Sequence, residues 1–151
     1  MRALPWIGIV LAGAIGFNIV DSRAAEQPPV PNMVGAWTGT SETVVFGHGG
    51  HYPGSKTIKD KPRLREVTYT LTVEGQDVRR FWGTIKSDSF SEPFAAIYST
   101  SHVYAYGADT DGFYHFKSHG PNRMELCYTQ PASGANESIA ASCTVFTRSQ
   151  Q

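Results

Sequence analysis

Two histidines, His48 and His51, stand three residues apart, and two imidazoles at such spacing can share a metal ion. The spacing is diagnostic on a helix, whereas the glycines around both residues oppose a helix at this point. No Asp or Glu between them completes a ligand set. Two interpretations stay open for residues 47–62, the longest connection in the chain: a metal site, or a flexible lid over the barrel mouth in which His48 and His51 are candidate ligand-binding residues. The glycines favour the lid, and we expect no metal.

Catalysis has no specific support in the sequence. A Gly-x-Ser-x-Gly elbow, which would expose a nucleophilic serine, does not occur. The remaining histidines, His102, His115 and His119, lie in or beside expected strands. Carboxylates that could pair for hydrolysis are dispersed, and most of them fit exposed strand or turn positions: Glu42, Glu66, Glu74, Glu92 and Glu125. We therefore assign no catalytic residue and expect no cofactor.

Four tyrosines, Tyr69, Tyr104, Tyr106 and Tyr128, are the best candidates for contacts with a small-molecule ligand. A tyrosine offers an apolar ring for contact and a hydroxyl that orients a ligand. Alternation along their segments directs Tyr69 and Tyr128 to the interior, and Tyr104 and Tyr106 are candidates for the same orientation. Core packing with hydrogen-bonded hydroxyls explains all four equally well.

The elements that must position these residues are short β-strands. Runs rich in Val, Thr, Tyr, Phe and Trp alternate with turn residues, and no long stretch has helical periodicity. Eight such runs follow one another: 34–46, 64–73, 78–87, 92–99, 102–107, 112–117, 123–129 and 140–148. Most connections are short, with turn signals at 74–77, 109–112 and 119–122. The pattern predicts an all-β, eight-stranded antiparallel up-and-down barrel, because closure removes both exposed sheet edges.

Alternation within the runs predicts which face each side chain takes. Val67, Tyr69, Leu71 and Val73 share one face of their run and should line the interior. In run 123–129, Met124, Leu126 and Tyr128 take the inner face, which directs Cys127 outward. Apolar residues occur on both faces of runs 78–87 and 112–117. This indicates either an outer surface covered by a second subunit, giving a homo-oligomer, or scattered surface aromatics.

Cys127 and Cys143 are the two cysteines of the chain, and we expect them to form a structural disulfide between neighbouring strands. An even pair in an exported protein is most simply a disulfide. The loop between them should contribute roughly 3 kcal/mol through restriction of the unfolded chain.

Residues 1–25 have the features of a signal peptide. Arg2 precedes an apolar stretch over 4–20, and Ala24 and Ala25 offer small residues for cleavage. An uncleaved membrane anchor is the alternative. After cleavage we expect no membrane contact, a periplasmic or secreted location, a flexible proline-rich lead over 26–33 and one barrel domain over 34–149. The 13 basic and 13 acidic side chains balance, so the chain has no strong positive electrostatic field that would favour binding to nucleic acid.

The segment Gly35-Ala36-Trp37, continued by Thr38-Gly39, opens the first run, and Arg148 closes the last. This Gly-x-Trp start, eight short strands and terminal Arg resemble the lipocalin and avidin group of barrels. The resemblance implies that Arg148 packs over Trp37 at a closed barrel end. The resemblance does not extend to the residues with which avidins bind biotin. The chain also resembles small exported bacterial proteins, which implies no activity.

Three functions follow from these patterns. The first is an exported module that binds a small, partly apolar ligand at the open end of the barrel. The second is an exported interaction or inhibitor protein with a filled barrel. The third is an enzyme that uses a cavity histidine. An aromatic-lined cavity favours the first, a packed interior with an exposed patch the second, and converging His and carboxylate groups the third.

Overall fold

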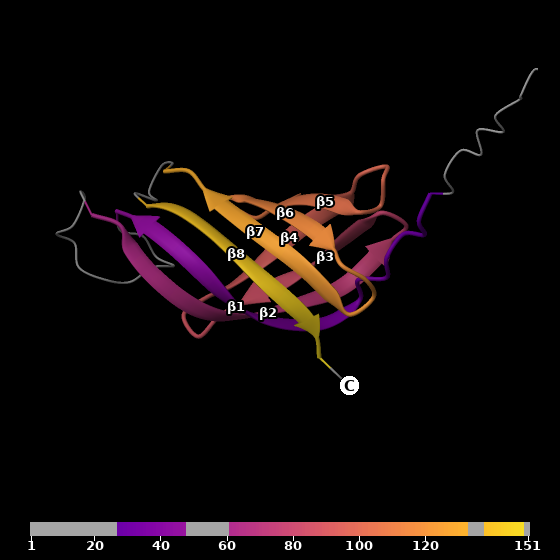
Figure 1. Ribbon diagram of the computed structural model, residues 1–151, viewed down its shortest axis with the longest axis horizontal. Helices are drawn as coiled ribbons and strands as arrows, with labels where there is room; N and C mark the ends of the chain where they lie inside the picture. The colour runs from indigo at the N-terminus through magenta and orange to yellow at the C-terminus, as the bar shows by residue number, and fades with distance from the viewer. Residues whose placement is uncertain (1–26, 48–60, 133–137, 150–151) are drawn as a thin grey trace, which may run out of the picture.

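The computed structural model describes residues 27–47, 61–132 and 138–149. Within these ranges the chain forms eight antiparallel strands that pair in sequence order and close into a barrel around one axis (Figure 1). The strands are β1 (Gly35–Phe46), β2 (Arg63–Asp77), β3 (Arg80–Lys86), β4 (Ser91–Tyr98), β5 (Tyr104–Ala108), β6 (Phe113–Ser118), β7 (Arg123–Gln130) and β8 (Ile139–Arg148). The predicted fold class is confirmed. In the described part of the chain, no helix has the length and apolar character to cross a membrane.

The turn predicted at residues 74–77 was wrong, because β2 continues through these residues to Asp77. A register shift between Val73 and Gly75 accommodates the polar residues within the paired strand. The chain reverses instead at Val78 and Arg79, since Asp77 pairs with Arg80. Val78 has a φ of 51°, a left-handed conformation that glycine or asparagine usually takes in two-residue hairpin loops.

The barrel interior divides into two halves of different chemistry. One end is formed by the starts of the odd-numbered strands and the ends of the even-numbered ones, and large apolar side chains fill it. These include Trp37, Leu71, Phe81, Phe94, Phe116, Met124 and Phe146. We call this the closed end. Toward the opposite end, the open end, inward positions carry Ser41, Thr43, Glu92, Tyr114, Tyr128, Gln130, Ser142 and Thr144.

Trp37 and Arg148 seal the closed end in the arrangement that the resemblance implied. Trp37 is 1% exposed, and the Arg148 guanidinium carbon lies 4.1 Å from the centre of its ring. The indole Nε1 donates a hydrogen bond to the carbonyl oxygen of Met33. Arg148 donates to the carbonyl oxygens of Asn32, Val34 and Pro121. One guanidinium thus joins the lead, a loop and the last strand.

The described part of the proline-rich lead is anchored rather than free. Met33 is 2% exposed and belongs to the core. Its backbone N–H donates to Gln76 Oε1, and the Tyr98 hydroxyl donates to its sulfur at 3.0 Å. Further upstream, the His102 ring lies within hydrogen-bond distance of the Pro28 carbonyl. The lead therefore packs across the closed end, at the right of the view in Figure 1.

A disulfide joins Cys127 and Cys143, as predicted. The two residues are direct partners on β7 and β8, with Cα atoms 4.1 Å apart. Their neighbours Leu126 and Thr144 are buried, so the bridge lies on the outer face of the barrel. It cross-links two strands without occupying interior volume.

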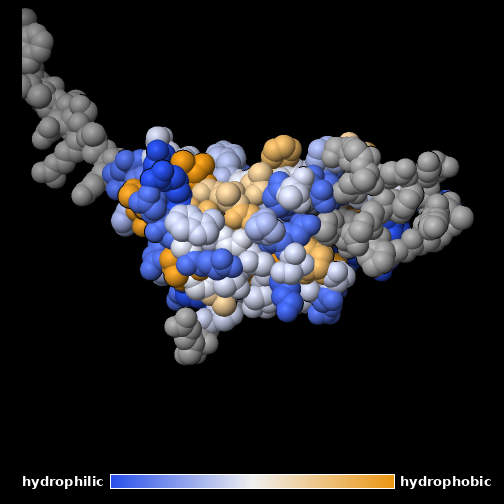
Figure 2. All heavy atoms as spheres, turned by 180° about the vertical axis from the view of Figure 1, so that it is seen from behind, coloured by the Kyte–Doolittle hydropathy of each residue, from blue (hydrophilic) through white to orange (hydrophobic). Residues whose placement is uncertain are grey.

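The outer surface carries single apolar side chains among polar ones. Trp82, Ile97, Tyr106 and Phe113 are exposed on the strands β3 to β6. Seen from behind, the molecule shows apolar areas interspersed with hydrophilic ones (Figure 2). This surface does not form one continuous apolar face in that view.

Candidate functional site

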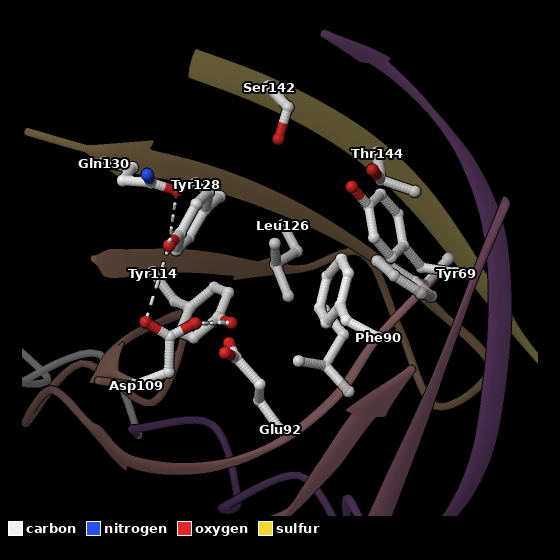
Figure 3. A pocket seen from close by; sticks show the side chains of 12 residues that line it. Tyr69, Phe90, Glu92, Asp109, Tyr114, Leu126, Tyr128, Gln130, Ser142 and Thr144 are labelled. Atoms are coloured by element: carbon white, nitrogen blue, oxygen red, sulfur yellow. Dashed lines mark hydrogen bonds between the residues drawn. The ribbon is translucent and has the colours of Figure 1, made fainter. Parts of the chain in front are cut away.

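A pocket opens into the polar half of the barrel, at the end from which the β1–β2, β3–β4, β5–β6 and β7–β8 connections leave. It is lined by Tyr69, Ile85, Phe90, Glu92, Asp109, Tyr114, Leu126, Tyr128, Gln130, Ser142, Thr144 and Phe146 (Figure 3). The cavity within it measures about 20 Å³, which is room for little more than one water molecule. Only a small chemical group can therefore enter the barrel without rearrangement of the walls.

Asp109, in the β5–β6 turn, organises one wall of the pocket. Its Oδ1 accepts hydrogen bonds from the backbone N–H groups of Asp111 at 2.9 Å and Gly112 at 2.7 Å. The Tyr114 hydroxyl donates to its Oδ2, and the Tyr128 hydroxyl lies 3.4 Å from its Oδ1. The carboxylate thus closes the turn and fixes two tyrosine hydroxyls at the same time.

Gly112 lets Tyr128 lie close against this turn. A Cβ at position 112 would stand 2.6 Å from the Tyr128 ring and 2.5 Å from the Thr129 carbonyl oxygen. Tyr114 and Tyr128 pair directly across β6 and β7, with ring centres 4.9 Å apart. The two rings therefore form one continuous aromatic wall.

Glu92 brings a second carboxylate into the pocket. It occupies an inward position of β4, on the same face as the buried Phe94 and Tyr98. Figure 3 shows its carboxylate between Asp109 and Phe90, directed toward the Tyr114 hydroxyl. On the far side, Phe90 and Tyr69 pack with ring centres 5.9 Å apart. Two carboxylates and four aromatic rings therefore face one small space.

Burial raises the pKa of Tyr114 far above its ordinary value, with further contributions from its hydrogen bond to Asp109 and from the charges of Asp109 and Glu92. An ionised phenol here would add a third negative charge to a sheltered site. At the closed end, burial raises the pKa of Tyr98 to about 12, partly offset by Arg148.

These two tyrosines should make the fold sensitive to alkali. Both pKa values are higher in the folded than in the unfolded chain, so the stabilisation is present below about pH 10 and decreases as the pH rises toward 12. In a titration of tyrosinate absorbance, we expect Tyr98 and Tyr114 to ionise only as circular dichroism reports unfolding. Tyr98→Phe should remove one of these two late ionisations. Ionisation of both tyrosines in a folded chain would contradict the assignment.

The four candidate tyrosines divide between the two faces of the barrel. Tyr69 and Tyr128 line the pocket. The inward orientation of Tyr104 and Tyr106 was wrong: they are 37% and 57% exposed and stack on both sides of His115 on the outer face.

The packing around Phe116 explains this correction. The inward residues of β5 are Ala105 and Gly107, and a Cβ on Gly107 would come within 3.3 Å of the Phe116 ring. Phe116 also packs against Phe81 and Phe94. The interior at this level therefore accepts small side chains from β5, and large ones must face outward.

His48 and His51 lie outside the described residues, as does most of the lid expected over 47–62. The histidines that the structure describes lie away from the pocket: His102 contacts Pro28, His115 is on the outer face, and His119 lies 3.9 Å from Glu125. No three His, Cys, Asp or Glu side chains of the described ranges are close enough to hold a metal ion together.

Sequence analysis missed the polar members of the pocket, above all Glu92 and Asp109. Glu92 was interpreted as one of several exposed charges and Asp109 only as part of a turn signal. The alternation of side chains along β4 could have revealed Glu92. It stands an even number of residues before Phe94, Ala96 and Tyr98, and therefore faces the interior as they do. Gln130 likewise continues the inward series of Met124, Leu126 and Tyr128. For Asp109, no pattern along the chain indicated its contacts with two tyrosines.

Comparison with known proteins does not add to these observations, because no family model matches the sequence and no similar sequence is found among curated proteins.

Proposed function

We propose that this chain is an exported binding module whose open barrel end holds one polar group of a small, partly apolar ligand. The observation that carries the proposal is that the barrel interior divides into an apolar half at the closed end and a polar half at the open end. A barrel that serves only as a stable core has no need of Glu92, Ser142 and Thr144 on inward positions. Burying polar groups costs free energy unless they are satisfied, whereas apolar side chains fill the other half without that cost.

The cavity size defines how such a ligand would bind. Pockets that enclose a whole drug-sized molecule measure several hundred Å³. The space of about 20 Å³ suits a head group, with the apolar remainder of the ligand at the mouth, next to Tyr69 and Phe90. Binding at the mouth of a small β-barrel is a common use of this architecture.

Export, to the periplasm or the exterior, belongs to the same proposal. The Cys127–Cys143 disulfide supports it, because such bonds persist in oxidising compartments. Relationship to the lipocalin and avidin group is also proposed, and the stacking of Arg148 on Trp37 supports it.

A second candidate is an interaction protein that acts through its outer face. The small cavity and the exposed Trp82, Tyr106 and Phe113 favour this alternative. Ile97 and Tyr106 are direct partners on β4 and β5, so part of this surface is contiguous. Aromatic side chains are enriched in the cores of protein interfaces, and a second copy of this chain would be the simplest occupant.

Native mass spectrometry of the protein isolated from the cells that make it tests both candidates. We expect a monomer that carries the added mass of a small molecule. Ser142→Phe, which places a ring in the pocket, should lose that mass, whereas Ser101→Phe on an exposed closed-end loop should retain it. A ligand-free dimer that dissociates in Trp82→Arg would support the second candidate. A ligand-free monomer would contradict both.

A further inference from the structure

The Thr144 hydroxyl is a buried polar group without a partner among the described residues. Thr144 is 4% exposed and lines the pocket from β8. Its methyl group is directed toward Gly39 on β1, and Figure 3 shows its hydroxyl beside Tyr69, facing the pocket. The hydroxyl makes no hydrogen bond within the described part of the chain. A buried hydroxyl without a partner destabilises a fold, so we expect a group in the pocket to pair with it.

The side chains next to this hydroxyl are uncharged. Leu126 is the direct partner of Thr144 on β7, and Tyr69 from β2 faces the same part of the pocket. Figure 3 shows Phe90 and Leu126 between Thr144 and the Glu92 carboxylate. Thr144 and Glu92 therefore belong to different parts of the pocket, and one small group cannot contact both.

An ionised ligand group would find no partner beside Thr144. Of the twelve described residues that line the pocket, none is Lys, Arg or His, so an anion has no counter-charge. Asp109 already accepts hydrogen bonds from two backbone N–H groups and from the Tyr114 hydroxyl, and Glu92 has an interaction partner of its own within the chain. Burying a charge without a partner costs far more free energy than burying an uncharged polar group that is hydrogen-bonded. The pocket therefore favours an uncharged group at Thr144.

We infer that the open end of the barrel binds a small, partly apolar ligand through an uncharged oxygen, of an alcohol or a carbonyl, that hydrogen-bonds to the Thr144 hydroxyl. A threonine hydroxyl can donate to either oxygen and can also accept from an alcohol. One oxygen atom matches the cavity of about 20 Å³, whereas a carboxylate or a phosphate exceeds it. The apolar remainder of the ligand stays at the mouth, next to Tyr69 and Phe90. This inference rests on the proposed function, because it names the class of ligand for the same pocket.

Probes that share one aromatic ring and differ in one group test the charge and the oxygen. Toluene, benzyl alcohol, acetophenone, benzylammonium and phenylacetate are titrated into the full chain at neutral pH, and amide chemical shifts report binding. We expect benzyl alcohol or acetophenone to bind several-fold tighter than toluene and at least about tenfold tighter than either ion. The largest shifts should occur at Leu126 and Thr144. Tighter binding of acetophenone assigns the oxygen to a carbonyl, and tighter binding of benzyl alcohol assigns it to an alcohol.

Variants of Thr144 separate the effect of its hydroxyl from that of its shape. Thr144→Val should reduce the affinity for the tighter oxygen probe to that for toluene and leave toluene binding unchanged. It should not lower the unfolding temperature, because the hydroxyl that it removes has no partner in the fold. Thr144→Ser retains the hydroxyl and should retain the preference for oxygen. Thr72→Val, on the exposed face of β2, is the matched control and should change no affinity. Circular dichroism verifies that each variant is folded, and the comparison of probes on the unaltered chain depends on no variant.

The outcomes separate this inference from the proposed function. Tightest binding of an ion, or equal binding of toluene and both oxygen probes, would overturn the inference and leave a ligand site at the open end. A Thr144→Val variant that loses stability and retains the preference for oxygen would also overturn it, since the hydroxyl would then serve the fold alone. Absence of binding by all five probes would do the same, while a co-purified mass that Ser142→Phe removes would still support the proposed function.

Discussion

Replacing Trp37 with alanine should lower the free energy of unfolding by about 3–5 kcal/mol, the largest loss that we expect from one substitution in this chain. Trp37 is buried, and its removal would leave a cavity at the closed end. It would also leave the Met33 carbonyl without its indole donor and Arg148 without the ring beneath it. Urea unfolding followed by circular dichroism measures the change.

Trp82→Ala is the matched control for this experiment. Trp82 is 47% exposed on the outer face of β3, so its removal should cost about 1 kcal/mol. A double-mutant cycle of Trp37→Ala with Arg148→Ala isolates the contact between guanidinium and ring, for which we expect about 1–2 kcal/mol of coupling. Equal losses at Trp37 and Trp82, or no coupling, would show that the closed end is not held as described.

Asp109→Ala should lower the free energy of unfolding by about 3 kcal/mol and disorganise the pocket. The substitution removes the acceptor of two backbone N–H groups in the β5–β6 turn and leaves the buried Tyr114 hydroxyl unpaired. Asp109→Asn retains one carbonyl oxygen and should lose less. The measurement is again urea unfolding, with Asp88→Ala in an exposed turn as the control, expected within about 0.5 kcal/mol of wild type.

A second readout distinguishes the contact from a general loss of stability. The hydrogen bond and the charge of Asp109 both raise the pKa of Tyr114. In Asp109→Ala, Tyr114 should therefore ionise at a lower pH and before circular dichroism reports unfolding, while Tyr98 at the other end of the barrel should still ionise only together with unfolding. An unaltered alkaline titration together with unaltered stability would contradict the assigned role of Asp109.

The barrel could be predicted from sequence because alternation is a local property. In β2 the series Val67, Tyr69, Leu71 and Val73 specifies one inner face without reference to any other strand. The same logic placed Cys127, and with it the disulfide predicted from the cysteine pair, on the outer face. It failed in β5, where five residues give too short a pattern and the volume of Phe116 decides which side chains fit inside.

The pocket was harder to predict because its members come from strands that are distant along the barrel wall. Glu92, Asp109 and Thr144 belong to β4, the β5–β6 turn and β8, and only closure brings them to one space. The alternation of side chains along β4 could have indicated that Glu92 faces inward. It could not have indicated that Tyr114 and Tyr128 would both contact one turn carboxylate, because that depends on the tilt and stagger of the strands.

Both ends of the described chain leave the molecule at the same pole. The lead crosses the closed end, and the Ser149 N–H bonds to the Ala36 carbonyl beside it. Whatever precedes Gln27 or follows Ser149 is thus attached on the side away from the pocket. A molecule tethered to a surface through either terminus would hold its mouth toward the surrounding medium. An affinity tag or fluorescent fusion at either terminus should likewise leave the pocket unobstructed.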